Sequence, residues 1–180
     1  ALFYSLMGAF AAGACLLVTR KFSASKFWEN ASALGATQVN IIAAVGNILS
    51  QRSRAEFTNH KIKKVYGAPV SASIEKIFRE EFKIPTVLEG YGMTEIPGAI
   101  NNQIEGKWKI NTMGVEAKHP DHSLKFTELK ILDEEENEVK TGEAGELVVK
   151  TPLLMMGYYK DEKQSKESFT KDDKNIRGNA

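Results

Sequence analysis

Disulfide bonding within the chain is excluded because the sequence has almost no cysteine. Its 180 residues include a single cysteine, Cys15. Such chains are typical of reducing compartments, and we expect a cytoplasmic location. Cys15 lies in the apolar segment AAGACLLVT. Because an apolar setting disfavours the thiolate, the sequence predicts a buried and unreactive thiol.

An excess of charge is also absent. There are 24 lysines and arginines against 23 aspartates and glutamates, a formal net charge of +1. This balance gives no electrostatic case for a nucleic acid or a membrane surface as partner. The basic cluster Lys61, Lys63 and Lys64 beside Tyr66 is expected to be solvated. A hydrophobic content of 42% supports a real core, so one domain, or a large domain with a small companion, is predicted.

Residues 1–19 carry no charge, and a run of that length reaches the threshold for a membrane span. The run also divides well into a helix at 2–12, a stop at Gly13 and a buried strand at 14–19. We therefore expect no integral membrane span. No basic region precedes the run, which argues against a signal peptide. The sequence does not begin with Met, and we expect it to be a piece of a longer protein.

Helices and strands alternate in the predicted pattern of the first half. Helices are expected at 22–35, 46–57 and 71–83, and strands at 37–45, through Val65 and from 86 onward. Ser23 or Ser25 is expected to cap the first of these helices, and Ser71 or Ser73 the third. The alternation predicts an α/β fold with a mainly parallel sheet and flanking helices.

The second half lacks a helical period. The segment LKFTELKILDEEENEVKTGEAGELVVKTP predicts a smaller antiparallel β subdomain, like a distorted barrel, with the acidic run 133–136 at a hairpin tip. We predict an α/β subdomain at 1–108, the antiparallel subdomain at 109–170 and a loosely held polar tail at 171–180.

Two glycine-rich turns follow predicted strands, YGAP at 66–69 and GYGMTE at 90–95. Ligands of parallel sheets bind beyond the carboxyl ends of strands, so these turns are expected to form one site. The Tyr91 ring could stack on a base, the Thr94 hydroxyl could donate to phosphate, and Glu95 is a hard ligand suited to Mg²⁺. The alternative is a β-turn with incidental polar residues.

The motif YGMTE, with YGAP before it and GELVVKTPLLMMGYYKDEKQSKESF after it, resembles the adenylate-forming superfamily. This superfamily comprises acyl-CoA synthetases, luciferases and peptide-synthetase adenylation domains. The resemblance covers residues 1–170 and implies part of the large N-terminal domain of an acetyl-CoA synthetase-like fold. It implies ATP or AMP and Mg²⁺ as cofactors, CoA as co-substrate and a carboxylic acid as substrate, with fatty-acid or crotonobetaine/carnitine ligases as the most similar type.

The resemblance also implies roles for individual residues. The catalytic residues that the resemblance implies are Thr94, which would bind the α-phosphate, and Glu95, which would bind Mg²⁺. Tyr91 would stack on adenine. The other residues expected to bind the nucleotide are Gly67, Ala68, Pro69, Glu89, Gly90, Gly92 and Met93. The residues expected to line the acyl pocket, for which plain sheet core is the alternative, are Ile42, Ala44, Val45, Gly46, Ile96, Pro97 and Gly98.

The chain departs from the family pattern in three places. The phosphate-binding loop with its Lys, the ribose-binding Thr-Gly-Asp after Phe169, and the C-terminal domain with its catalytic Lys are not in this sequence. The tail NIRGNA resembles a shortened form of the hinge motif before that domain. We therefore expect the chain by itself to be inactive.

Other functions remain open. An amino-acid adenylation domain usually places an Asp at the start of the pocket strand, and 37–45 has no acid. A luciferase-like oxygenase, a non-catalytic nucleotide-binding module and a membrane-anchored protein are the further alternatives.

Overall fold

The computed structural model describes all residues except 1, 58, 106–108, 110–111, 172–174 and 179–180. The chain forms two compact units. Unit 1 comprises Ala1–Gly90 and Asn102–Met113, and unit 2 comprises Tyr91–Asn101 and Gly114–Ala180. Each unit takes two segments of the chain, whereas the predicted subdomains are continuous. The predicted boundary between residues 108 and 109 stays a prediction.

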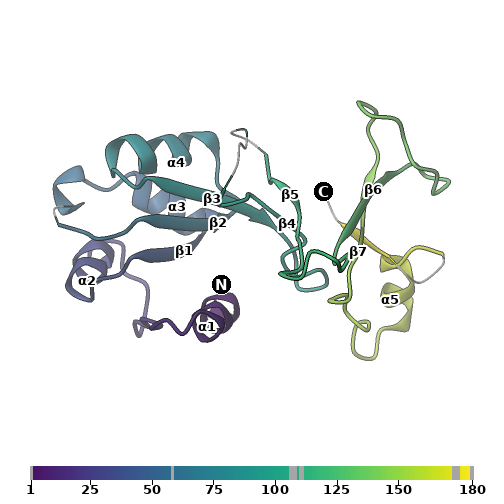
Figure 1. The fold of residues 1–180 in the computed structure, drawn as a ribbon, viewed down its shortest axis with the longest axis horizontal. Helices are drawn as coiled ribbons and strands as arrows, with labels where there is room; N and C mark the ends of the chain where they lie inside the picture. Colours follow the sequence, from purple (N-terminus) through teal and green to yellow (C-terminus); the bar gives the residue numbers. More distant parts are fainter. Residues whose placement is uncertain (1, 58, 106–108, 110–111, 172–174, 179–180) are drawn as a thin grey trace. The chain divides into compact units, whose positions relative to one another are not determined.

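A parallel sheet forms the centre of unit 1 (Figure 1). Its strands are β1 (Gln38–Ile42), β2 (Lys64–Ala68) and β3 (Thr86–Tyr91). Ile41 pairs with Gly67, and Gly67 pairs with Glu89. The predicted α/β fold with a parallel sheet is confirmed, and this register aligns the carboxyl ends of the three strands.

Helical segments surround these strands. They are α1 (Leu2–Ala11), α2 (Phe27–Ala33), α3 (Ala43–Ser50), the 3₁₀ helix η1 (Arg54–Phe57), α4 (Ala72–Lys76) and the π-helix η2 (Ile77–Glu81). Trp28 of α2 lies edge-on to Phe78 of η2 and to Phe82. These rings join β-branched side chains of the strands, such as Val65 and Val87, in one buried core.

Two predictions near the N-terminus are wrong. Residues 14–19 form no strand, and the Cys15 thiol is exposed. Apolar composition does not make a strand without a neighbour for its backbone N–H and C=O groups, and in the described part of the chain no strand pairs with this segment. The predicted cap at Ser23 or Ser25 is wrong as well, because α2 begins after Lys26 without a side-chain cap, and the two serine hydroxyls lie 3.4 Å from each other.

The predicted strand 37–45 is too long. β1 ends at Ile42, and α3 begins at Ala43. Alanine is the best helix former, so consecutive alanines favour leaving the strand there. The predicted helix 46–57 therefore starts earlier and ends at Ser50, before the separate η1. The third helix begins as predicted, because the Ser71 hydroxyl accepts the Ile74 N–H.

Unit 2 contains antiparallel strands. β4 (Ile100–Asn101) pairs with β5 (Val115–Glu116), and β7 (Glu146–Lys150) lies between β6 (Glu128–Leu132) and β8 (Ile176–Gly178). The helix α5 (Glu162–Ser168) lies between β7 and β8 in the sequence. The predicted smaller antiparallel sheet is confirmed. The acidic run follows β6 in a turn in which Asp133 accepts the backbone N–H groups of Glu135 and Asn137.

The prediction of a loosely held tail is wrong for residues 176–178. They form β8, and the Ile176 side chain is completely buried in the core of unit 2. Arg177 forms ion pairs with Glu136, at 2.5 Å, and with Glu146. The polar composition predicted a free end, but these residues pair with β7 and add one buried isoleucine and one ion-paired arginine.

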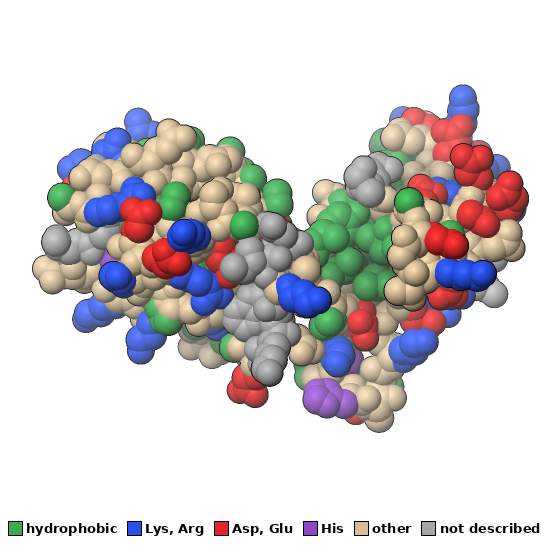
Figure 2. Space-filling view, turned by 90° about the horizontal axis from the view of Figure 1, so that it is seen from above, with side chains coloured by type: hydrophobic (Ala, Val, Ile, Leu, Met, Phe, Trp, Pro, Cys, Tyr) green, Lys and Arg blue, Asp and Glu red, His purple; other side chains and the backbone are tan. Residues whose placement is uncertain are grey.

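The surface has a mixed charge. On the face shown in Figure 2, basic and acidic side chains are interspersed, as the balanced composition predicts. Among the described residues, no helix is both long enough and apolar enough to span a membrane.

Candidate functional site

A cavity of about 400 Å³ lies at the carboxyl ends of β1 and β2 in unit 1. It is lined by residues of α3, of the segment after β2, of α4 and of β3, and by one residue that precedes β5: Ala43, Asn47, Pro69, Val70, Ser71, Ile74, Glu89 and Met113. Pro69 and Glu89 were both predicted to bind the nucleotide. The structure brings these two residues together at the edge of the sheet where ligands of parallel sheets bind.

Glu89 is held at both its backbone and its side chain. Its backbone N–H donates to Asn102 Oδ1 at 2.7 Å, and its carbonyl accepts the Asn102 N–H at 2.8 Å. Its carboxylate accepts the Val70 N–H at 3.1 Å. Burial raises the pKa of the Glu89 carboxyl above its ordinary value, partly offset by the Val70 N–H. Glu89 therefore fixes the loop after β2 to β3.

Gly67 permits the chain to fold back after β2. A Cβ atom at this position would lie 2.5 Å from Val70 Cγ2 and 3.1 Å from Ile41 Cγ1. The peptide bond between Ala68 and Pro69 is cis. The segment predicted to approach adenine is thus tightly packed against its own sheet, although Gly67 and Ala68 do not line the cavity.

The predicted turn after β3 lies in unit 2 and closes on itself. Met93 N–H donates to the Ile96 carbonyl at 3.2 Å, and Ile96 N–H donates to the Met93 carbonyl at 3.1 Å. A Cβ atom at Gly92 would lie 2.5 Å from the Gly98 nitrogen. Gly98 has a φ of 61°, the left-handed region. A glycine is therefore required at 92 because the backbone near Gly98 lies so close. A glycine is favoured at 98 because its φ is positive.

Tyr91, the last residue of β3, packs against the core of unit 2. Its hydroxyl lies 3.9 Å from Met93 Sδ, and burial raises the pKa of its phenol. A Cβ atom at Gly178 would lie 2.8 Å from this hydroxyl, so β8 limits the space around the ring. Tyr91 as a whole is neither fully buried nor fully exposed.

Thr94 and Glu95, the predicted catalytic pair, lie within this turn. Thr94 is exposed, and Glu95 is half-buried. Glu95 Oε1 accepts a hydrogen bond from the Tyr158 hydroxyl at 2.7 Å, and its backbone carbonyl accepts the Met155 N–H at 3.0 Å. The segment around 155–158 therefore holds Glu95 at two points.

The residues predicted for the acyl pocket have varied surroundings. Ala44, Val45 and Gly46 lie on α3, not on a strand, and Ile42 is 51% exposed. Ile96 is completely buried in the core of unit 2. Pro97 and Gly98 follow it in the turn and are half-buried. In the described residues, Ala43 and Asn47 of α3 line the cavity near Glu89 instead. The acyl-pocket assignment stays a prediction.

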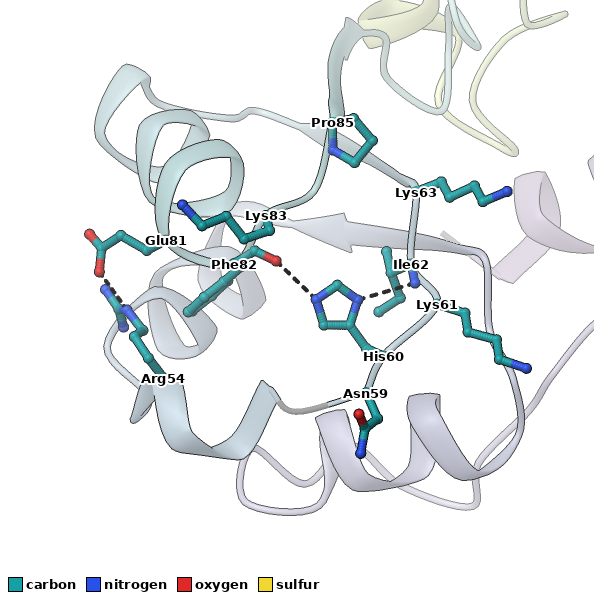
Figure 3. A pocket seen from close by; sticks show the side chains of 10 residues that line it. All are labelled: Arg54, Asn59, His60, Lys61, Ile62, Lys63, Glu81, Phe82, Lys83 and Pro85. Carbon is teal, nitrogen blue, oxygen red and sulfur yellow. Dashed lines mark hydrogen bonds and ion pairs between the residues drawn. The ribbon is translucent and has the colours of Figure 1, made fainter.

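A second cavity, of about 510 Å³, lies near the amino ends of β2 and β3 in unit 1 (Figure 3). His60 accepts the Ile62 N–H at Nδ1 and donates from Nε2 to the Phe82 carbonyl at 2.9 Å. Lys61 and Lys63 extend together, away from Lys83. The ammonium groups therefore do not converge on one point, and the imidazole serves to connect two backbone segments.

Two residues important for the site were missed by sequence reasoning. Asn102 is 7% exposed and fixes Glu89, and Tyr158 donates to Glu95. Asn102 stands beside a second asparagine in a polar stretch, with nothing in the pattern to distinguish it. Tyr158 lies in the GYY segment that carried the resemblance, but its partner is 63 positions away.

Proteins of known name are similar to parts of this chain. The "very long-chain fatty acid transport protein" of Saccharomyces cerevisiae is 33% identical over 99 residues, covering 54% of this chain and 15% of that protein. The "4-coumarate–CoA ligase-like 4" of Oryza sativa subsp. japonica is 25% identical over 170 residues, covering 92% of this chain and 29% of that protein. The chain thus spans less than a third of the length of these relatives.

Solved structures share the fold. An O-succinylbenzoate coenzyme A synthetase from Bacillus subtilis, in complex with ATP and magnesium ion, matches with a TM-score of 0.75 and 20% identity, covering 97% of this chain and 35% of that one. The model of the family described as "AMP-binding enzyme" matches residues 1–159, which include both glycine-rich turns and Tyr158. By that match, the chain belongs to the AMP-binding enzyme family.

Proposed function

We propose that this chain is part of an ATP-dependent acyl-CoA ligase. The observation that carries the proposal is the closed turn bearing Tyr91, Thr94 and Glu95 in a member of the AMP-binding enzyme family. The name of one relative supports it, since that protein is called 4-coumarate–CoA ligase-like 4.

The proposed reaction has two steps. A carboxylate oxygen of the acid attacks the α-phosphorus of ATP, and pyrophosphate leaves. The sulfur of CoA, its proton lost to solvent, then attacks the acyl carbon, and AMP leaves as the acyl–oxygen bond breaks. In the first step the protein positions the reactants and stabilises negative charge.

Tyr91 stacks on adenine, and the Thr94 hydroxyl donates to an α-phosphate oxygen. The other proposed nucleotide contacts are Gly67, Ala68, Pro69, Glu89, Gly90, Gly92 and Met93.

Glu95 is the proposed ligand of Mg²⁺, which would neutralise phosphate charge when bound. Mg²⁺ usually binds through one or two carboxylates together with phosphate oxygens and water. Within the described part of the chain, Glu95 Oε1 is engaged by Tyr158, and Oε2 accepts no hydrogen bond from the protein. That oxygen fits the ion, and the described residues contain no group of three or more His, Cys, Asp or Glu side chains that could hold a metal ion by themselves.

The proposed substrates are fatty acids. The proposed location of the protein is the cytoplasm. An exposed free thiol at Cys15 suits a reducing compartment. The relatives are more than three times as long as this chain, so the 180 residues by themselves are expected to be inactive.

The experiment is carboxylate-dependent exchange of pyrophosphate into ATP, run on the chain and on the full-length protein that contains it. A panel of fatty acids, carnitine-like acids and amino acids supplies the carboxylate. We expect exchange by the full-length protein with fatty acids and none by the chain alone. Exchange with amino acids would instead identify an amino-acid adenylating enzyme. If no acid supports exchange, the protein is a nucleotide-binding module.

Tyr91→Ala in the full-length protein tests the stacking contact. Loss of base stacking is expected to weaken ATP binding by about 1–3 kcal/mol, measured by calorimetric titration. Tyr91→Phe keeps the ring and is expected to bind ATP as the parent does. Unchanged affinity in the alanine variant would make Tyr91 a core aromatic without a role in binding.

A further inference from the structure

The Tyr158 phenol is the only side chain in the described residues that donates a hydrogen bond to the Glu95 carboxylate. The two residues are 63 positions apart and are 2.7 Å from each other at Oη and Oε1. A hydrogen bond to an ionised acceptor is roughly twice as strong as one between neutral groups. The hydrogen bond from Tyr158 occupies Oε1 of Glu95 and leaves Oε2 for a ligand.

The segment that carries Tyr158 is itself fixed. Tyr158 N–H donates to Ser165 Oγ at 2.7 Å, and that hydroxyl donates to the Asp161 carbonyl at 2.6 Å. The Asp161 side chain caps α5 by accepting the Gln164 N–H at 3.0 Å. Helix α5 therefore fixes the backbone from which the Tyr158 ring extends.

A glycine precedes Tyr158 for a physical reason. Gly157 has a φ of 135°, and a Cβ atom there would lie 3.1 Å from Ser165 Oγ. The next residue, Tyr159, is 88% exposed. Two adjacent tyrosines thus have different surroundings, since one contacts Glu95 and the other extends into solvent.

We propose that Tyr158 is a positioning residue for the proposed metal ligand Glu95, holding Oε1 so that Oε2 stays available to bind Mg²⁺. This inference rests on the proposed function for the identity of the ion, but the contact itself does not depend on it. Residues that orient metal ligands by hydrogen bonding commonly affect metal affinity when they are replaced. Tyr158 touches neither substrate nor nucleotide in this proposal.

The test is Tyr158→Phe in the full-length protein, with Tyr159→Phe as the matched control. Both changes remove one hydroxyl, and Tyr158→Phe keeps the backbone bond to Ser165. We expect Tyr158→Phe to raise the Mg²⁺ concentration for half-maximal pyrophosphate exchange by about 10- to 100-fold. The rate at saturating Mg²⁺ should stay close to that of the parent, and Tyr159→Phe should change neither quantity.

A second measurement does not require activity. Binding of Mn²⁺ in the presence of a non-hydrolysable ATP analogue is followed by electron paramagnetic resonance. We expect weaker Mn²⁺ binding in Tyr158→Phe than in Tyr159→Phe, and no further loss when Tyr158→Phe is added to Glu95→Gln, because the tyrosine acts through that carboxylate.

The outcomes separate the two proposals. An active parent with equal metal dependence in both phenylalanine variants overturns the positioning role and leaves the ligase function standing. A parent that is inactive with every acid overturns the ligase function, and the Mn²⁺ measurement then decides on Tyr158 alone. A loss of stability in Tyr158→Phe without a change in metal binding would make the contact structural and overturn the proposal.

Discussion

Single residues control the turn that carries Thr94 and Glu95. Gly92 lets the chain pass close to its own backbone, and Gly98 adopts a left-handed conformation that other residues rarely take. The two glycines are therefore needed for different reasons, Gly92 for space and Gly98 for its backbone conformation. The carboxylate of Glu95 gains its orientation from Tyr158, a residue distant in sequence.

Gly92→Ala is expected to destabilise the chain by about 1–3 kcal/mol, because the added methyl group meets backbone atoms that cannot move aside cheaply. It would lie 2.5 Å from the Gly98 nitrogen and 2.9 Å from the Ile96 carbonyl oxygen. Urea unfolding measures the effect. Gly8→Ala is the control, since no atom lies within 4 Å of a Cβ there and α1 should tolerate or favour alanine. Equal stability of the two variants would contradict the tight turn.

At the scale of helices and strands, hydrogen-bond and packing partners determine where an element begins and which kind of helix it forms. The clearest predicted helix, 71–83, begins at its predicted cap because the Ser71 hydroxyl accepts the Ile74 N–H. It also continues into a π-helix in which the Phe82 N–H bonds to the Ile77 carbonyl at 3.0 Å. Nothing in the spacing of its apolar residues predicts that widening. It places Phe78 and Phe82 against Trp28.

Ser71→Ala should cost about 0.5–1 kcal/mol, the lower part of the range for a lost N-terminal cap, because the hydrogen bond is long at 3.4 Å. Thermal unfolding monitored by circular dichroism measures it. Ser73→Ala removes the hydroxyl beside it, at 3.0 Å, but leaves the cap in place, so its effect should be smaller. A larger loss in Ser73→Ala would assign the cap to the wrong serine.

At the scale of the whole molecule, the charges are nearly balanced and many acids lie in exposed ion pairs. A hydrogen bond from Arg54 lowers the pKa of Glu81, and one from Lys125 lowers the pKa of Glu128. Glu89 is the exception, because burial raises its pKa. These groups act in opposite directions on stability as the pH changes.

The stability of the chain is expected to fall as the pH drops below about 4.5, the ordinary value for glutamate. A carboxyl with a lowered pKa stabilises the fold above its unfolded value, and that contribution is lost as the pH falls through the folded value. Because these pairs are exposed, the loss should be small and should shrink in 1 M salt. Melting temperatures across a pH series measure it. A rise in stability on acidification would show that Glu89 dominates.

The sequence by itself determined the alternation of elements, the parallel sheet, the separate antiparallel sheet and the family. These features depend on local periodicity and on short motifs, and both are formed by residues that lie close together in the sequence. Tertiary structure alone decided that residues 14–19 form no strand, that Ile176 is buried in β8 and that Tyr158 meets Glu95. Strand pairing, burial and long-range hydrogen bonds depend on which distant segment supplies the partner, and no local pattern encodes that choice.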